Sequence, residues 1–414
     1  MSSSPRHRDV WITGTGLLSS LGEGPDAHWE RLTDPAGPKP TLDETSFAPH
    51  PIHPLCAVNF DLQIPKKGDQ RQMEPWQRIG TYTAGLALSN AGVAQQAELL
   101  DRTHMIVAAG GGERDIAVDT ALANELAASN EPAGPFLNKR LAADLRPTLF
   151  LAQLSNLLAG SISIVHGVRG SSRTFMGEES AGADAVRVAG ARLQAGQIDL
   201  ALVGGSASAP RPEMMLLLSA GDVLLTGPYR PVWQRKEHPG FALGSMGAFV
   251  VLEDPAHAQA RGARGLARLV TTISTMSRRV PGTEQAEGER LAAELAPYLA
   301  PGPLGVLSGA SGAEPATSAE RHLLAAIGRD RKTFVRATGT MLGHSIEAQF
   351  PANVALAALA LSQGGFYPPF EPGPMEAPAT EPVRQILVTG FGQRRGEAMA
   401  LVTAIDNSGA ANAN

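Results

Sequence analysis

Apolar and polar residues form two patterns along this chain, one typical of strands and one typical of helices. Short β-rich or nearly continuous apolar runs predict strands, several of them buried on both faces; they lie at residues 9–16, 104–113, 198–207, 247–254, 304–307 and 385–392. Apolar residues at helical spacing predict helices over residues 73–91, near 289–298, near 317–326 and over 348–365. Strands that alternate with helices indicate an α/β protein with parallel sheets covered by helices.

Residues 174–205, "TFMGEESAGADAVRVAGARLQAGQIDLALVGG", predict a strand, a sharp turn, a helix and a second strand. The turn is of a kind that presents one reactive side chain at the start of a helix. Glu179 occupies that position and Ser180 follows it. A carboxylate is favoured at a helix N-terminus by the helix dipole and the free backbone amides. Glu179 is therefore expected to rigidify the helix behind it.

Composition narrows the function classes. A chain of 414 residues can form one large core or two closely packed halves. The net charge of −5 and the absence of a long basic run give no support to a nucleic-acid role. No apolar run is long enough to span a bilayer, and the first residues lack the apolar core of a signal peptide, so a soluble, cytoplasmic protein without membrane contact is expected. The polar residues 407–414 are expected to form a disordered tail.

Cysteine usage excludes two further kinds of site. The single cysteine, Cys56, rules out a disulfide within the chain and a cysteine-rich metal site, and its Pro/His-rich surroundings favour a packing role. No metal and no cofactor are expected. No internal repeat is evident in the sequence.

Five segments in the same order resemble the β-ketoacyl-acyl carrier protein synthases, members of the thiolase-like family. They lie at residues 10–32, 154–170, 195–207, 229–264 and 339–350. The resemblance runs from Val10 to about Ala404. It implies a thiolase-like α/β fold of two similar βαβ-rich halves, residues 1–254 and 255–414, that form a layered αβαβα core and usually a dimer.

The resemblance also assigns positions to the family's catalytic groups. The catalytic cysteine corresponds to Glu179, the first histidine falls near Gly309, and the lysine corresponds to Gly339. The second histidine is kept as His344, and the buried acid appears as Asn353. Only one catalytic side chain of this set is retained, so no catalytic residue is expected and His344 is interpreted as structural. The same assignment implies that Glu179 seals the vacant pocket and forms an ion pair or hydrogen bond with His344.

The family's terminal glycine-rich loop is kept as Gly390, Phe391 and Gly392, although it continues as "QRR". These three residues are candidates for lining or gating a substrate cavity. Ser180 is an alternative nucleophile, displaced by one helix position from the tip of the turn.

This profile resembles the chain-length-factor subunits of dissociated polyketide and polyene systems. The resemblance implies a non-catalytic subunit that forms a heterodimer with a cysteine-bearing ketosynthase and serves chain elongation on an acyl carrier protein, in polyketide, polyene or fatty-acid-type synthesis. One alternative is a malonyl-acyl carrier protein decarboxylase or priming enzyme of the same fold, which would use His344. Another is a self-standing condensing enzyme with an unusual nucleophile.

Acyl carrier proteins are acidic and are usually bound by basic surface residues. Arg71, Arg78, Arg394 and Arg395 are the candidates in this chain. Ordinary solvated surface charge is the alternative interpretation for each of them.

Overall fold

The protein is described here by a computed structural model, which covers residues 7–112, 114–146, 149–371 and 373–405. The C-terminal tail expected at residues 407–414 lies outside these ranges.

Among the described residues, eleven strands form one large sheet in the order β11-β10-β12-β13-β9-β1-β8-β6-β4-β5, with β2 paired to β1. The first half contributes β1 (Trp11–Ser19), β2 (Gly22–Glu23), β4 (His104–Ala108), β5 (Ser172–Phe175), β6 (Leu200–Ala207) and β8 (Met246–Glu253). The second contributes β9 (Ala267–Ser274), β10 (Leu304–Ser308), β11 (Thr333–Ala337), β12 (Gln385–Phe391) and β13 (Glu397–Thr403). A short pairing of β1 with β9, at Trp11–Arg268 and Ile12–Ala267, joins the halves. β3 (Ile52–His53) and β7 (Leu243–Gly244) form a separate ribbon.

The two halves of the sheet repeat one topology. When the five main strands of each half are numbered in chain order, both halves have the spatial order 3-2-4-5-1. Strand directions also agree, because β4 and β10 each have two parallel neighbours while β8 and β13 are antiparallel to both of theirs. No internal repeat is evident in the sequence, because the repeat lies in topology rather than in residue identity. The division of the chain at residue 254 stays a prediction; β8 ends at Glu253 and β9 begins at Ala267.

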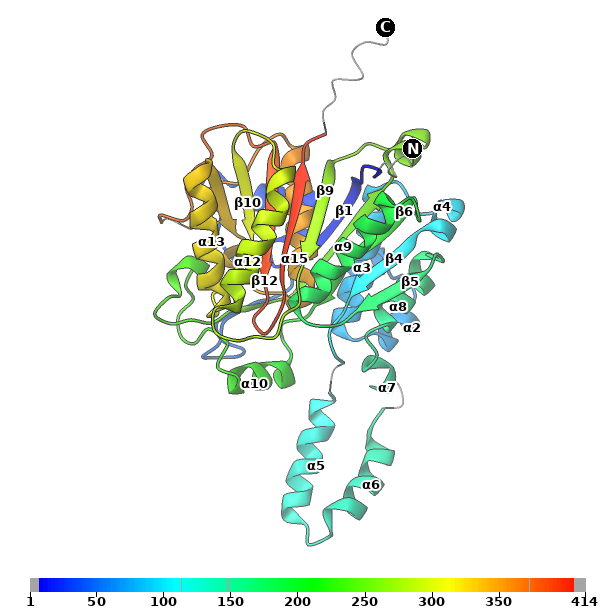
Figure 1. Cartoon of the computed structure of the whole chain (residues 1–414). Helices are drawn as coiled ribbons and strands as arrows, with labels where there is room; N and C mark the ends of the chain where they lie inside the picture. The colour runs from blue at the N-terminus through cyan, green and yellow to red at the C-terminus, as the bar shows by residue number, and fades with distance from the viewer. Residues whose placement is uncertain (1–6, 113, 147–148, 372, 406–414) are drawn as a thin grey trace.

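Helices complete five layers (Figure 1). α9 (Glu179–Gln194) and α15 (Gln349–Ser362) are packed against each other and against strands of both half-sheets, so they form the central layer. α3 (Pro75–Asn90) and α8 (Leu157–His166) lie on the first half-sheet, and α12 (Thr283–Leu295) and α13 (Ala316–Asp330) lie on the second. The predicted layered, thiolase-like α/β fold is confirmed.

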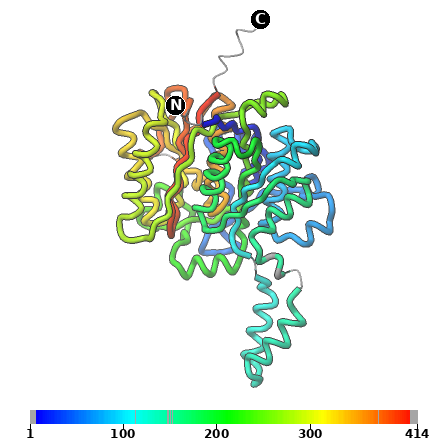
Figure 2. The backbone as a smooth tube through the Cα atoms, turned by 45° about the vertical axis from the view of Figure 1, so that its right-hand side comes forward, coloured from blue at the N-terminus to red at the C-terminus, as the bar shows by residue number. Residues whose placement is uncertain are grey.

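The remaining elements connect these layers, and α14 and η4 among them are largely buried. The helices are α1 (Gly24–Leu32), α2 (Lys67–Gln72), α4 (Ala97–Arg102), α5 (Ile116–Ala128), α6 (Ala133–Asp144), α7 (Leu149–Ala152), α10 (Pro212–Ala220), α11 (Pro255–Ala260) and α14 (Gly339–Leu342). Single 3₁₀ turns are η1 (Phe60–Leu62), η2 (Val232–Gln234), η3 (Ala296–Tyr298) and η4 (Ile346–Ala348). α5 and α6 form a hairpin that projects away from the layered body in both views (Figures 1 and 2). We call this hairpin, residues 116–144, the arm.

Two sequence-based expectations need correction. The sheet is mixed rather than parallel, because β12 returns directly into β13 as an antiparallel hairpin and β8 is antiparallel to both of its neighbours. The last strand predicted from the sequence ends at residue 392, whereas β13 (Glu397–Thr403) follows it.

The buried helices of the central layer meet through a glycine. A Cβ atom built on Gly182 of α9 would lie 2.3 Å from the Glu347 carbonyl oxygen and 2.8 Å from Pro351 Cδ. Both distances are shorter than real contacts, so residue 182 must be glycine for η4 and α15 to approach α9 this closely. This approach places the start of α9 beside the loop that precedes α15.

We predict that Gly182→Ala destabilises the protein by about 1–3 kcal/mol through overpacking, although alanine is the better helix former. Gly190→Ala is the matched control on the same helix, since its Cβ would meet only Leu269 Cδ2 at 3.5 Å. The control should leave stability unchanged or raise it by up to about 1 kcal/mol. Urea unfolding of the two variants measures the difference, and equal effects would contradict this account of the helix contact.

Candidate functional site

The turn before α9 has a strained backbone conformation of the kind that presents a reactive side chain at the start of a helix. β5 ends at Phe175, and Glu178 adopts φ 62° and ψ −140° immediately before α9 begins at Glu179. A non-glycine residue at positive φ costs on the order of 1–3 kcal/mol and is found mainly where the surrounding structure imposes it. The turn therefore holds Glu179 at the N-terminus of a buried helix, as the sequence analysis expected.

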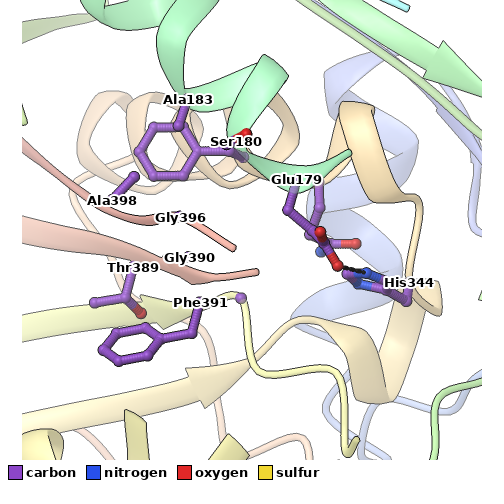
Figure 3. Close-up of a pocket in the computed structure, with 12 residues that line it drawn as sticks. Glu179, Ser180, Ala183, His344, Thr389, Gly390, Phe391, Gly396 and Ala398 are labelled. Carbon is purple, nitrogen blue, oxygen red and sulfur yellow. Dashed lines mark hydrogen bonds and ion pairs between the residues drawn. The ribbon is translucent and has the colours of Figure 1, made fainter. Parts of the chain in front are cut away.

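Glu179 turns its carboxylate inward and binds two other segments (Figure 3). Its Oε1 atom lies 3.0 Å from His344 Nε2 and accepts a hydrogen bond from the Gln393 backbone N–H, with an N···O distance of 3.3 Å. Burial raises the pKa of Glu179, but the His344 hydrogen bond and charge, together with the N–H groups of Glu179 and Gln393, outweigh it and hold this pKa below the usual value. Glu179 is thus ionised at neutral pH, and His344 Nε2–H donates to it.

His344 is held rigidly by backbone on both sides. Its N–H donates to the Ala242 carbonyl at 2.8 Å, and its carbonyl accepts from the Gly244 N–H at 3.0 Å. The imidazole packs on the Phe241 ring with 4.8 Å between ring centroids. Since Nε2 is already bound to Glu179, this nitrogen is not free to act on a substrate.

Gly309, near which the resemblance implies a histidine, has no room for a side chain. A Cβ atom at Gly309 would lie 2.6 Å from the Thr389 carbonyl oxygen, which also accepts the Gly309 N–H at 3.0 Å. Glu179, Gly309 and His344 line one narrow cavity of about 20 Å³. The structure therefore brings these three predicted positions together, but around a space too small for a substrate.

Gly339 and Asn353 lie behind this cavity in a neutral polar network. Asn353 Oδ1 accepts from Thr338 Oγ1 at 2.7 Å, and Gln349 Nε2 donates to the same hydroxyl at 3.0 Å. Gly339 starts α14, where a Cβ atom would lie 3.0 Å from the Ala310 carbonyl oxygen. The positions predicted for a lysine and an acid thus hold a glycine and an amide, with no ion pair between them.

The alternative nucleophiles lie in unreactive settings. Ser180 Oγ donates to the Gly177 carbonyl at 2.7 Å, which closes the turn and directs the hydroxyl away from His344. Cys56 packs beside the apolar cluster of Leu18 and Tyr82, and burial, with the nearby Glu23 charge, raises the pKa of its thiol. A raised pKa leaves the thiol protonated and weakly nucleophilic.

The retained glycine-rich loop has two roles. Gly390 and Phe391 line the narrow cavity, and Phe391 is buried against α12, where a Cβ on Gly288 would lie 2.7 Å from its ring. Gly392 N–H donates to the Gly396 carbonyl at 2.8 Å and closes the loop. The gating role proposed for these residues stays a prediction; the wider pocket nearby is lined by the next residues, Gln393 and Arg394.

This wider pocket has a volume of about 220 Å³ and opens on the other side of Glu179. Two of its acids, Glu178 and Glu347, were not singled out by the sequence analysis. Glu347 is nine-tenths buried, and burial, followed by the charges of Glu179 and Glu178, raises its pKa to about 7 against the opposing effects of its own N–H and Arg211. Its only sequence signal is a lone acid inside the otherwise apolar and amide-rich stretch "SIEAQF".

The four candidate basic residues are dispersed. Arg394 lies at the mouth of the wider pocket with its side chain 62% exposed and 3.7 Å from Glu178, and Arg395 is its exposed neighbour. Arg71 is exposed on α2, whereas Arg78 is partly buried over the Phe60 ring. Only Arg394 and Arg395 are therefore close to the site.

Two kinds of site are missing from the part of the chain that the structure covers. Within it, no helix has the length and apolar character needed to cross a membrane. The same residues contain no group of three or more His, Cys, Asp or Glu side chains placed to hold a metal ion.

Comparison with known proteins identifies the family. Residues 7–258 match the family model of the β-ketoacyl synthase N-terminal domain. The chain belongs to the β-ketoacyl synthase family. A 3-oxoacyl-acyl-carrier-protein synthase 2 of Rhizobium meliloti is 29% identical over 64% of this chain and 63% of its own length, so that match spans less than two thirds of the relative. A Mycobacterium tuberculosis protein of the same name is 26% identical over 85% of this chain and 84% of its own.

Solved structures agree on the fold. The ishigamide ketosynthase/chain length factor superposes with a TM-score of 0.78 over 97% of this chain and all of the other, at 20% identity. At that identity the likeness concerns architecture alone. The family membership and the site geometry together show a synthase fold in which a carboxylate occupies the turn.

We predict that Glu179→Ala lowers the free energy of unfolding by about 1–3 kcal/mol, because His344 Nε2–H and Gln393 N–H lose their acceptor. Glu179→Gln is the matched control and should lose less, since its amide oxygen can still accept. The folded-state pKa of Glu179 is depressed, so its contribution is present above the unfolded pKa of about 4.3 and is lost as pH falls through the folded pKa. Urea unfolding at pH 7 and pH 4 tests both statements; an Ala variant as stable as the wild type at pH 7 would refute them.

Glu347 gives the opposite pH dependence. Its folded pKa of about 7 lies above the unfolded value, so burying the carboxyl costs little below pH 4 and progressively more up to pH 7. Glu347→Gln should therefore stabilise the protein at pH 8 by up to about 3 kcal/mol, at 1.36 kcal/mol per pKa unit, and barely at pH 4. Thermal unfolding of both proteins across this range measures the effect. A pH-independent difference would show that Glu347 is not the titrating group.

Proposed function

We propose that this chain is a non-catalytic synthase-like subunit of the chain-length-factor kind, which pairs with a cysteine-bearing ketosynthase and shapes the acyl cavity during chain elongation on an acyl carrier protein. The observation that carries the proposal is the state of the nucleophile position. Glu179 is a carboxylate bound by His344 and by the Gln393 amide, and Gly309 is closed by the Thr389 carbonyl. Among the described residues at these positions, neither an acyl acceptor nor a free imidazole remains.

The names of relatives support the type of pathway that we propose. A Streptomyces rimosus relative, whose name refers to an oxytetracycline polyketide β-ketoacyl synthase, is 26% identical over 88% of this chain and 87% of its own. One superposed structure is described as a ketosynthase with its acyl-carrier protein in a type II system. These names support polyketide-type elongation. We propose that Arg394, at the mouth of the wider pocket, and its exposed neighbour Arg395 meet the acidic surface of the carrier.

The negative charge of the pocket argues against the alternative function, a malonyl-acyl carrier protein decarboxylase. A malonyl group carries a carboxylate, and the pocket beside Glu179 already contains the carboxyl groups of Glu178, Glu179 and Glu347. Like charges in a partly desolvated pocket repel one another. His344, the group that would assist decarboxylation, is hydrogen-bonded to one of these acids.

An unpartnered sheet edge supports pairing. β5 ends the sheet, and its carbonyls at Ser171 and Phe175 accept hydrogen bonds from β4, so Ser172 and Thr174 direct their N–H and C=O groups outward. Exposed apolar side chains lie next to this edge: Met176 is 63% exposed after β5 and Ile164 is 74% exposed on α8. Such an edge favours addition of a strand from another chain.

The arm offers a second element to the same partner. It stands clear of the body (Figure 2), Leu141 on α6 is exposed, and Leu151 on α7, beyond the end of the arm, is exposed as well. A lone two-helix hairpin has little apolar surface to bury within itself, so contact with another chain would stabilise it. We place the arm across the body of the partnering synthase.

The test is co-expression with a cysteine-bearing ketosynthase encoded by neighbouring genes, followed by native mass spectrometry. We expect a 1:1 complex. Met176→Arg and Thr174→Pro should each abolish it; the proline removes only the Thr174 N–H, which points outward from the sheet edge. Tyr298→Arg is the matched control, because Tyr298 is 52% exposed on η3 in the other half of the molecule. Incubation with an acyl-carrier thioester should then acylate the partner and leave this chain unmodified. A stable homodimer that ignores the synthase, or an adduct on Glu179 or Ser180, would disprove the proposal.

A further inference from the structure

The pocket of about 220 Å³ beside Glu179 has two chemically different walls. One wall is apolar and consists of Met176, Met214, Leu217, Leu218, Val223 and Phe241. The other carries the three acids Glu178, Glu179 and Glu347. A purely apolar ligand would leave the carboxyl groups without hydrogen-bond donors. A purely polar ligand would leave the apolar wall exposed to water.

Two of the acids retain unused acceptor capacity. Glu178 Oε2 is buried without a hydrogen-bond partner among the described residues. Glu347 is nine-tenths buried, and within the same part of the chain its carboxyl group receives a hydrogen bond from its own N–H alone. A buried carboxyl without donors is costly, so each of these groups would be stabilised by a ligand that donates hydrogen bonds.

The nearby positive charges do not fill this role. His344 packs on Phe241 of the apolar wall, and its Nε2 is already hydrogen-bonded to Glu179. Arg394 stands at the mouth, largely exposed, with its guanidinium 3.7 Å from Glu178 Oε1 rather than at the buried Oε2. Arg211 binds the Gly112 carbonyl at 2.7 Å and Glu213 at 2.8 Å. The interior of the pocket thus presents acceptors and net negative charge.

We propose that this pocket binds a protonated primary amine carried on a short apolar chain, with the ammonium group between Glu178 and Glu347 and the chain against the methionine and leucine side chains. An ammonium group offers three N–H donors and a positive charge, and charge-assisted hydrogen bonds are the strongest available to a buried carboxylate. An acyl chain that ends in a carboxylate is excluded by repulsion, and a simple alkyl chain gains nothing from the acids. The proposal goes beyond the pairing function and does not depend on it.

Calorimetric titration of the full-length protein at pH 7.5 with n-hexylammonium, n-hexanol and n-hexanoate tests this specificity. The three probes share a chain and differ in charge. Hexylammonium should bind about tenfold or more tightly than hexanol, as one or two charge-assisted hydrogen bonds require, and hexanoate should bind most weakly. Glu347→Gln and Glu178→Gln should each reduce the preference for the ammonium while hexanol binding is kept. Glu30→Gln, on the exposed face of α1, is the matched control and should change nothing.

Leu218→Trp fills the apolar wall and should remove binding of all three probes, which locates the site without altering an acid. Equal affinities for hexylammonium and hexanol, a preference for hexanoate, or no binding of any probe would each overturn the proposal. So would an ammonium preference that survives both glutamine variants. None of these results depends on whether a ketosynthase partner binds.

Discussion

The ionised carboxylate of Glu179 is the interaction on which the rest of the site depends. It joins three segments that are distant in sequence: the start of α9, the loop of His344 before α15, and the loop of Gln393 between β12 and β13. A carboxylate can serve all three because it only accepts, and each segment presents a donor. The hydrogen bonds and the His344 charge outweigh the cost of burial, which is why the pKa of Glu179 lies below its usual value.

Other changes around the turn are consistent with this anchor. The backbone of β12 fills the space at Gly309, and an amide at Asn353 joins a network of hydroxyl and amide groups where a charged pair could otherwise lie. Neutral groups need no charged partner when buried, so the region behind His344 is stable without a lysine. The site is therefore organised to hold its shape, and the strained backbone of Glu178 is retained as part of that shape.

Glu347 stands in contrast to Glu179. Both are buried, but Glu179 has donors from two other segments, whereas the pKa of Glu347 is raised to about 7 by burial and by its acidic neighbours. At neutral pH such a group reduces stability. Proteins tolerate groups of this kind at binding sites, where a ligand rather than the fold supplies the missing partner. The position of Glu347 in a pocket with an apolar wall fits that pattern.

The sequence by itself determined the α/β class and the location of the turn at Glu179, because apolar periodicity and glycine-rich turns are local signals. The resemblance of five segments to the β-ketoacyl synthases implied the layered fold, the kinship of the chain and His344 as a partner for Glu179. Only the tertiary structure decided that Gly309 is closed by the Thr389 carbonyl and that Glu178 and Glu347 share one pocket with Glu179. These facts depend on the close approach of α9 to η4 and α15 at Gly182, and on the repeat of strand order between the halves. Such contacts join residues far apart in the chain, and no local pattern of apolar and polar positions encodes them.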